Sequence, residues 1–133
     1  MIKKQFTLYL ENKPGTLAGV AKMLARKKIN IEGISVSAST DVALVQITVD
    51  NAARTSKALG EAKVPFTVQD VCLLPLKNEP GALAAASSKL AASGVNISYI
   101  YATACDCRSA CNCYCIIGAP DLKKVEKVWK TAM

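Results

Sequence analysis

Apolar and polar residues alternate at the start of the chain and then change to helical spacing. Phe6, Leu8 and Leu10 alternate with polar positions, which predicts a half-buried strand ending at the turn Asn12-Lys-Pro-Gly. From Thr16 to about Lys28, apolar residues recur at helical spacing with basic residues opposite, which predicts a helix. Its expected core-facing residues are Leu17, Val20, Ala21, Leu24 and Ala25.

Further elements follow along the first half of the chain. Residues 29–37 alternate, residues 39–41 supply a turn, and residues 42–50 are rich in β-branched residues, so a hairpin is expected. Asn51 is a suitable N-cap for a second helix to about Ala62, and residues 64–76 return to a strand pattern. The predicted order is β-α-β-β-α-β.

The second half of the chain repeats the first. Residues 77–100 align with residues 11–34 at an offset of 66 positions, with ten identical residues. The pattern predicts a helix at 82–93, strands at 95–104 and 113–117, and a last helix capped by Asp121. No strand pattern follows that helix, so the second unit lacks its last strand.

These patterns predict an α+β protein built from two units, residues 1–68 and 69–133. Each unit is expected to be an antiparallel sheet with helices on one face. Residues 66–76 would serve both units as one long strand or two nearly continuous ones. Because the missing strand leaves an open sheet edge, we expect a homo-oligomer, most simply a homodimer, to cover it.

Two motifs resemble the ACT domain, a small regulatory module that senses amino acids. They are Asn12-Lys-Pro-Gly-Thr-Leu-Ala with Ile29-Asn-Ile, and Asn78-Glu-Pro-Gly-Ala-Leu-Ala with Val95-Asn-Ile. The resemblance covers both halves and implies ferredoxin-like units that pair side by side. It further implies that a small effector, usually an amino acid, binds between units at the turn that enters the first helix.

The chemistry of this turn points the same way. Gly15 and Gly81 allow a sharp bend, and the helix that follows offers unpaired N–H groups and a positive dipole end to a carboxylate. Side-chain amides nearby can donate and accept hydrogen bonds. The expected ligand-binding residues are Asn12, Gly15, Thr16, Leu17, Asn30, Asn78, Gly81, Ala82, Leu83 and Asn96. The alternative, in which the Asn residues cap turns and the Gly residues only make them, stays open.

Five of the six cysteines cluster in the second hairpin, at positions 105, 107, 111, 113 and 115. If Cys107 pairs with Cys111, then Cys105, Cys107, Cys111 and Cys113 share one face and could hold a thiophilic metal ion such as Cu(I). If Cys107 instead pairs with Ala110, Cys113 and Cys115 turn toward the helices and the cluster is split. A disulfide across the hairpin is a further possibility. No cofactor is certain, and the ACT pattern does not include this cluster.

The composition of the chain argues against several classes of function. The chain has 17 Lys and Arg, 10 Asp and Glu, and no His, so the commonest general base is missing and an enzyme is not expected. The basic residues at the end of the first helix lack the interleaved aromatics of an RNA-binding surface, so nucleic acid is not expected as a partner. No apolar stretch is long enough to span a membrane and no secretory signal is evident, which favours a cytoplasmic protein.

The leading hypothesis is a free-standing regulatory protein that binds an amino acid between its two ACT-like units. Binding would stabilise one arrangement of the units and so signal allosterically to a regulated enzyme or another regulator. The competing hypothesis is a thiol-based metal or redox sensor that uses the Cys105 to Cys115 hairpin.

Overall fold

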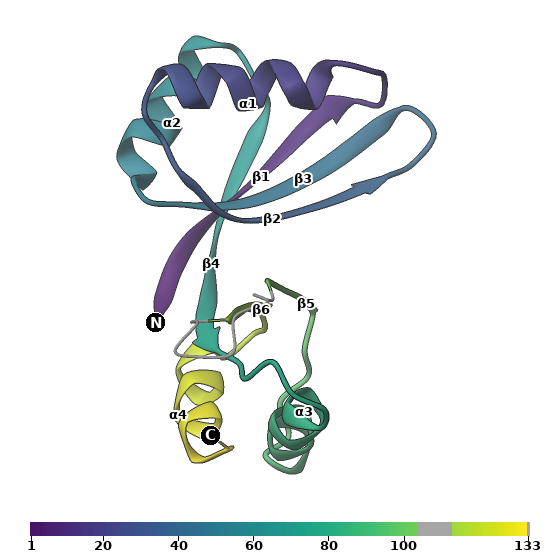
Figure 1. Ribbon diagram of the computed structural model, residues 1–133, viewed down its shortest axis with the longest axis vertical. Helices are drawn as coiled ribbons and strands as arrows, with labels where there is room; N and C mark the ends of the chain where they lie inside the picture. Colours follow the sequence, from purple (N-terminus) through teal and green to yellow (C-terminus); the bar gives the residue numbers. More distant parts are fainter. Residues whose placement is uncertain (104–112, 133) are drawn as a thin grey trace. The chain divides into compact units, whose positions relative to one another are not determined.

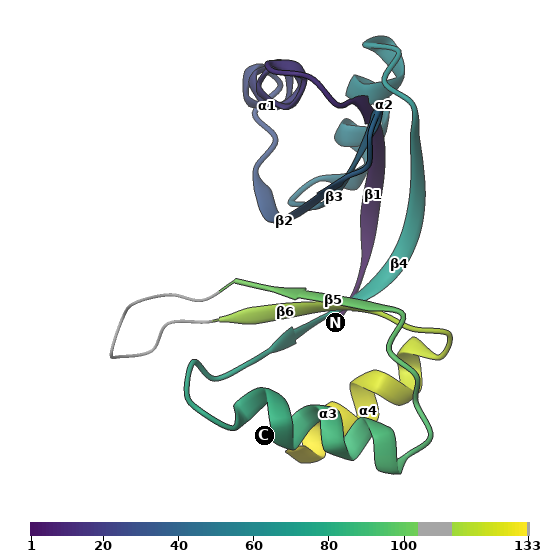
Figure 2. The ribbon, with the colours of Figure 1, turned by 90° about the vertical axis from the view of Figure 1, so that its right-hand side faces the viewer.

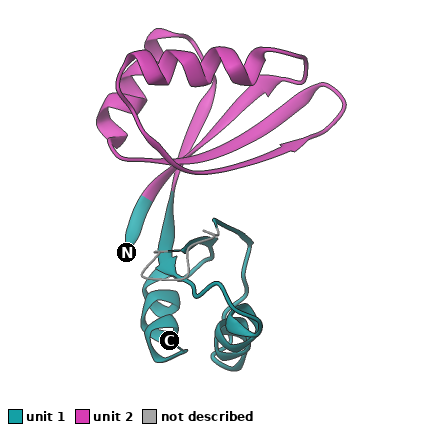
Figure 3. Ribbon diagram, in the orientation of Figure 1, with its two compact units in different colours: residues 1–3, 70–133 teal, residues 4–69 magenta. Residues whose placement is uncertain are grey.

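The computed structural model describes residues 1–103 and 113–132 and divides into two compact units. We term Lys4–Gln69 the N-terminal unit, and Met1–Lys3 together with Asp70–Met133 the C-terminal unit (Figure 3). None of the helices in the described residues is long and apolar enough to cross a membrane.

The N-terminal unit has the predicted β-α-β-β-α-β order (Figure 1). Its elements are β1 (Ile2–Glu11), α1 (Thr16–Arg26), β2 (Ile31–Ala38), β3 (Val42–Val49), α2 (Ala52–Glu61) and the first part of β4 (Phe66–Pro75). The strands are ordered β2-β3-β1-β4, and β3 pairs antiparallel with both β1 and β2. Tyr9 N donates to Pro65 O at 3.0 Å, just before β4 begins.

The core of this unit lies between one sheet face and the two helices. Phe6, Leu8 and Ile47 from the sheet pack with Leu24 of α1 and Leu59 of α2, and all five are almost fully buried. Alternation along β1 and β3 places these apolar side chains on the same face. The helices therefore cover one face, as the sequence predicts.

The C-terminal unit repeats this arrangement (Figure 2). Its elements are the end of β4, α3 (Ala82–Ala92), β5 (Tyr99–Ala102), β6 (Tyr114–Gly118) and α4 (Leu122–Ala132). The strands are ordered β1-β4-β6-β5, with β6 antiparallel to β4 and β5. Trp129 of α4 is buried in the core, and its Nε1 donates to Pro75 O at 2.7 Å.

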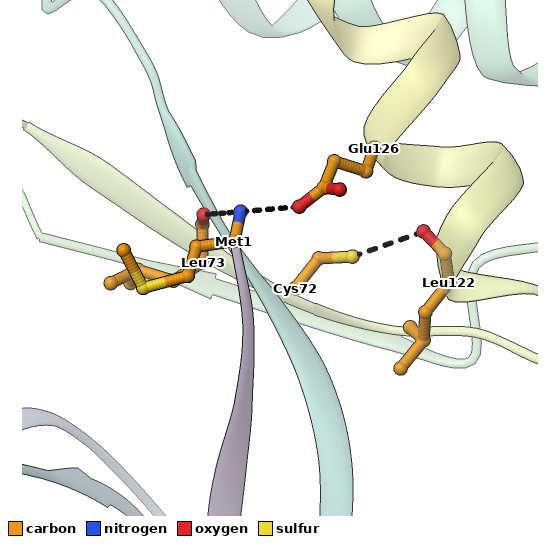
Figure 4. Close-up of polar contacts among 5 residues, drawn as sticks. All are labelled: Met1, Cys72, Leu73, Leu122 and Glu126. Carbon is orange, nitrogen blue, oxygen red and sulfur yellow. Dashed lines mark hydrogen bonds and ion pairs between the residues drawn. The ribbon is translucent and has the colours of Figure 1, made fainter.

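The start of β1 occupies the edge that the missing strand would close (Figure 4). Met1 N donates to Leu73 O at 3.0 Å, and Leu73 N donates to Met1 O at 2.7 Å. The Met1 ammonium also lies 2.7 Å from a carboxylate oxygen of Glu126 on α4. Within residues 1–103 and 113–132 no strand follows α4, and residues from the start of β1 lie at the position of that last strand. The open edge therefore no longer argues for a homodimer, which stays a prediction.

Some boundaries differ from the sequence prediction because the helix ends form local hydrogen bonds. Lys28 and Gly94, equivalent in the repeat, both have positive φ, 57° and 75°. Beyond them, Ile29 N donates to Leu24 O and Val95 N to Leu90 O, as in a Schellman motif. These bonds end α1 at Arg26 and α3 at Ala92. β5 begins only at Tyr99, so the strand predicted from residue 95 is shorter.

Candidate functional site at the two Pro-Gly turns

The two Pro-Gly turns have the same backbone geometry. Gly15 has φ 90° and ψ −14°, and Gly81 has φ 88° and ψ −11°, a left-handed conformation that favours glycine. Gly19 N donates to Gly15 O, and Ala85 N donates to Gly81 O, both at 2.9 Å. The sharp bend predicted from the sequence is thus present in both units.

Within the described residues, no side chain caps the helices that follow these turns. By contrast, Asn51 Oδ1 accepts from Arg54 N in α2, and Asp121 Oδ1 accepts from Lys124 N in α4. At the starts of α1 and α3, four backbone N–H groups have no acceptor in the part of the chain that the structure describes. They belong to Leu17, Ala18, Leu83 and Ala84. Such groups and the helix dipole favour an anion.

Several of the expected ligand-binding side chains hold the first turn together. Asn12 Nδ2 donates to Ser39 O at 2.8 Å, tying the turn to the β2–β3 hairpin. Thr16 Oγ1 donates to Glu11 O at 2.8 Å. In their present contacts these two residues are structural, although each remains at the surface near Gly15.

The remaining expected residues lie at or near the surface. Asn30 is exposed, and its backbone N donates to Asp50 Oδ1 at 3.0 Å. Leu17 and Leu83 are 39% and 49% exposed, so the core-facing position predicted for Leu17 is wrong. The stripe of α1 that packs on the core comprises Val20, Met23 and Leu24, and it begins one turn later. The others are Asn78, Gly81 and Asn96, which are exposed, and Ala82, which is half-buried.

A cleft of about 540 Å³ opens beside Gly15, entirely within the N-terminal unit. One wall is α1, the floor is the end of β1, and the other wall is the loop between α2 and β4. Its lining residues are Tyr9, Leu10, Glu11, Lys13, Gly15, Thr16, Gly19, Val20, Met23, Ala62, Lys63, Val64 and Pro65. Val20, Met23 and Val64 give it an apolar wall that adjoins the core.

An ion pair lies among the residues that line this cleft. Lys13 Nζ is 2.9 Å from Glu11 Oε2, and both side chains are exposed. The hydrogen bond from Lys13 lowers the pKa of the Glu11 carboxyl, and the same bond raises the pKa of Lys13. A positive and a negative group thus stand together beside the uncapped start of α1.

The C-terminal unit has a smaller cleft at the equivalent place. It measures about 240 Å³ and is lined by Lys77, Glu79, Pro80, Gly81, Ala82, Ala85 and Ala132. Lys77 and Glu79 occupy the positions of Glu11 and Lys13, with the charges exchanged. The sequence prediction did not include these four charged residues, because charged residues beside a turn are common. Their recurrence two residues apart at the 66-residue offset was the signal that could have found them.

Of the cysteine cluster, only Cys113 and Cys115 lie in described residues. Cys105, Cys107 and Cys111 lie outside them. In the described strands Ala102 pairs with Cys115. This is the register expected if Cys107 pairs with Ala110, the alternative that splits the cluster. Cys115 lies in the core with Cys72, and burial raises the pKa of its thiol to about 12, which disfavours the thiolate that a metal requires. Within residues 1–103 and 113–132, Cys72 and Cys115 are free thiols, and a metal site at the cluster stays a prediction.

Comparison with known proteins identifies the fold as that of a known family. A family model described as an ACT domain pair matches residues 1–109. The chain belongs to the ACT domain pair family. None of the curated proteins gives a significant match.

Solved structures agree with this assignment. This ACT domain pair is similar to protein BT0572 from Bacteroides thetaiotaomicron, with 30% identity over 98% of this chain and 88% of that one, at a TM-score of 0.88. The regulatory subunit of aspartate kinase from Thermus thermophilus, in a ligand-free form, is 20% identical over 100% and 95% of the two chains, at a TM-score of 0.70. The corresponding subunit from Thermus flavus is 18% identical over 99% of this chain and 95% of that one, at a TM-score of 0.62. At these identities the two kinase subunits support the fold alone.

Proposed function

We propose that this ACT domain pair is a regulatory protein that binds a free amino acid at its Pro-Gly turns. The observation that carries the proposal is the combination at Gly15. There, an uncapped helix start and a Glu11–Lys13 ion pair adjoin a cleft with an apolar wall. Membership of the ACT domain pair family supports a regulatory role.

An amino acid matches the charges of this site. Its α-carboxylate would accept from the N–H groups of Leu17 and Ala18 and lie near the Lys13 ammonium. Its α-ammonium would pair with the Glu11 carboxylate. The two protein charges that now neutralise each other would each gain a partner of opposite sign.

The cleft beside Gly15 is the preferred site of the two. It is larger than the cleft beside Gly81, and Val20, Met23 and Val64 can receive an apolar side chain. Bridging of the two units by the effector stays a prediction from the sequence. Transmission would then follow from any difference in amino-acid affinity between two states of the protein.

Thermal unfolding in the presence of each of the twenty amino acids tests the proposal. A ligand at a hundredfold excess over its Kd stabilises the native state by about 2.7 kcal/mol. We expect one amino acid, or a few similar ones, to raise the melting temperature. Its methyl ester and its N-acetyl derivative, which each lose one charge, should not.

Paired variants locate the site. Glu11→Gln with Lys13→Met should abolish the shift, while Lys77→Met with Glu79→Gln, the matched change at the other turn, should leave most of it. The proposal fails if no amino acid shifts the midpoint, or if the ester and the N-acetyl form act as well as the free amino acid.

A further inference from the structure

A second concave surface lies between the helices of the C-terminal unit. This α3–α4 groove measures about 460 Å³. Its lining residues are Lys89, Ala92 and Ser93 from the end of α3, and Lys124, Lys127, Val128 and Thr131 from α4. Ala92, Val128 and the aliphatic stems of the lysines supply apolar surface, and the ammonium groups can reach solvent around it.

The charges of the α3–α4 groove are not balanced within it. Among the residues that the structure describes, no acidic residue lines it. The carboxylate that α4 does carry, Glu126, pairs with the Met1 ammonium instead. Lys89 Nζ donates to Thr131 O, whereas the ammonium groups of Lys124 and Lys127 have no acceptor in residues 1–103 and 113–132.

The N-terminal unit has a groove at the equivalent place, between α1 and α2. It measures about 260 Å³ and is lined by Lys27, Arg54, Lys57, Ala58 and Glu61. The repeat offsets are 66 for α1 and 70 for α2, so these residues correspond to Ser93, Lys124, Lys127, Val128 and Thr131. The cations Arg54 and Lys57 thus correspond to Lys124 and Lys127.

The two grooves differ in one charge pair. In the N-terminal unit Lys27 Nζ lies 3.8 Å from Glu61 Oε2. Ser93 and Thr131 occupy those two positions in the α3–α4 groove, where the carboxylate is absent and the groove is larger. In the described part of the chain, the α3–α4 groove therefore offers three lysines and no carboxylate to balance them.

We propose that the α3–α4 groove is a docking site for an acidic segment of a protein partner, one in which Asp or Glu residues flank an apolar ridge. The apolar residues would contact Val128 and Ala92, and the carboxylates would pair with Lys124 and Lys127. This partner complements both the floor and the charge of the groove. A nucleic acid matches only the charge, because no aromatic side chain of the described residues lines the groove for base stacking.

This inference goes beyond the proposed effector site and does not depend on it. It assigns the surface through which a regulatory protein contacts its target. The Pro-Gly turns and the α3–α4 groove share no residue, so variants of one leave the other intact.

Fluorescence anisotropy with a labelled synthetic helix of glutamate and leucine tests the proposal, without any amino acid present. Two charge-reversal pairs are compared at one salt concentration: Lys124→Glu with Lys127→Glu, and the matched Arg54→Glu with Lys57→Glu. Both pairs change the net charge equally. A milder pair, Lys124→Gln with Lys127→Gln, serves if the reversal lowers the melting temperature. A glutamine version of the peptide and a labelled DNA duplex are the reference ligands.

We expect the Lys124 and Lys127 reversal to weaken binding of the acidic helix by about tenfold or more, and the Arg54 and Lys57 reversal by less than about threefold. The glutamine version should not bind. Equal losses from the two pairs would show non-specific attraction and overturn the proposal. It is also overturned if the duplex binds more tightly than the acidic helix and loses affinity in the same variant.

Discussion

Replacing Gly15 with alanine isolates the energetic cost of the turn that shapes the candidate site. An added Cβ at Gly15 would meet no atom within 4 Å, so the effect comes from the backbone alone. The left-handed conformation at φ 90° costs an alanine about 1–2 kcal/mol. Alanine also restricts the unfolded chain, which returns about 0.4–1 kcal/mol. The expected net destabilisation of Gly15→Ala is about 1 kcal/mol.

Gly19 provides a matched control four residues away. It lies inside α1, its Cβ would also meet no atom within 4 Å, and its φ is not positive. Gly19→Ala should therefore stabilise the protein by about 0.5–1 kcal/mol. In urea unfolding the two variants should move the midpoint in opposite directions, with free energies that differ by about 2 kcal/mol. Equal shifts in the same direction would refute the account of this turn.

Two further predictions concern the C-terminal unit. A Cβ at Gly118 would overlap the ring of Tyr99 on the neighbouring strand, so Gly118→Ala should destabilise by about 1–3 kcal/mol. With Tyr99→Ser added, the double variant should lose less unfolding free energy than the two single variants lose in sum. Strict additivity of these losses in chemical unfolding would contradict the overlap. The Met1 ammonium lowers the pKa of Glu126 below 4.5, mainly through its hydrogen bond. The stability that the Met1–Glu126 ion pair adds is present above pH 4.5 and is lost as the pH falls through the folded-state pKa of Glu126. The urea midpoints of wild type and Glu126→Gln should therefore differ at neutral pH and converge in acid, and a pH-independent gap would argue against the pair.

Most of the fold could be predicted because the same sequence pattern occurs twice in the chain. The alternation around Leu8, the spacing around Leu24 and the repeated Pro-Gly turns each carry a local signal with a known period. Those signals predicted the β-α-β-β-α-β order, the helices on one sheet face within each unit, and the long strand β4. The turn conformation at Gly15 and Gly81 followed from glycine itself.

What could not be predicted depends on partners far apart in sequence. Alternation identifies β1 as a strand but not that Met1 pairs with Leu73. The amide of Asn12 could equally have faced a ligand, and only the position of Ser39 shows that it holds a hairpin. The Glu11–Lys13 pair was overlooked because charged residues beside a turn are common and carry no periodic signal.

The contacts of Met1 bear on how fast the protein folds. Its hydrogen bond to Leu73 joins residues 72 positions apart, and its ion pair reaches a helix close to the end of the chain. Contacts of such high sequence separation close large loops at an entropic cost before they contribute stability. We therefore expect the sheet edge formed by Met1 and Leu73 to assemble late, after the helices and hairpins of each unit.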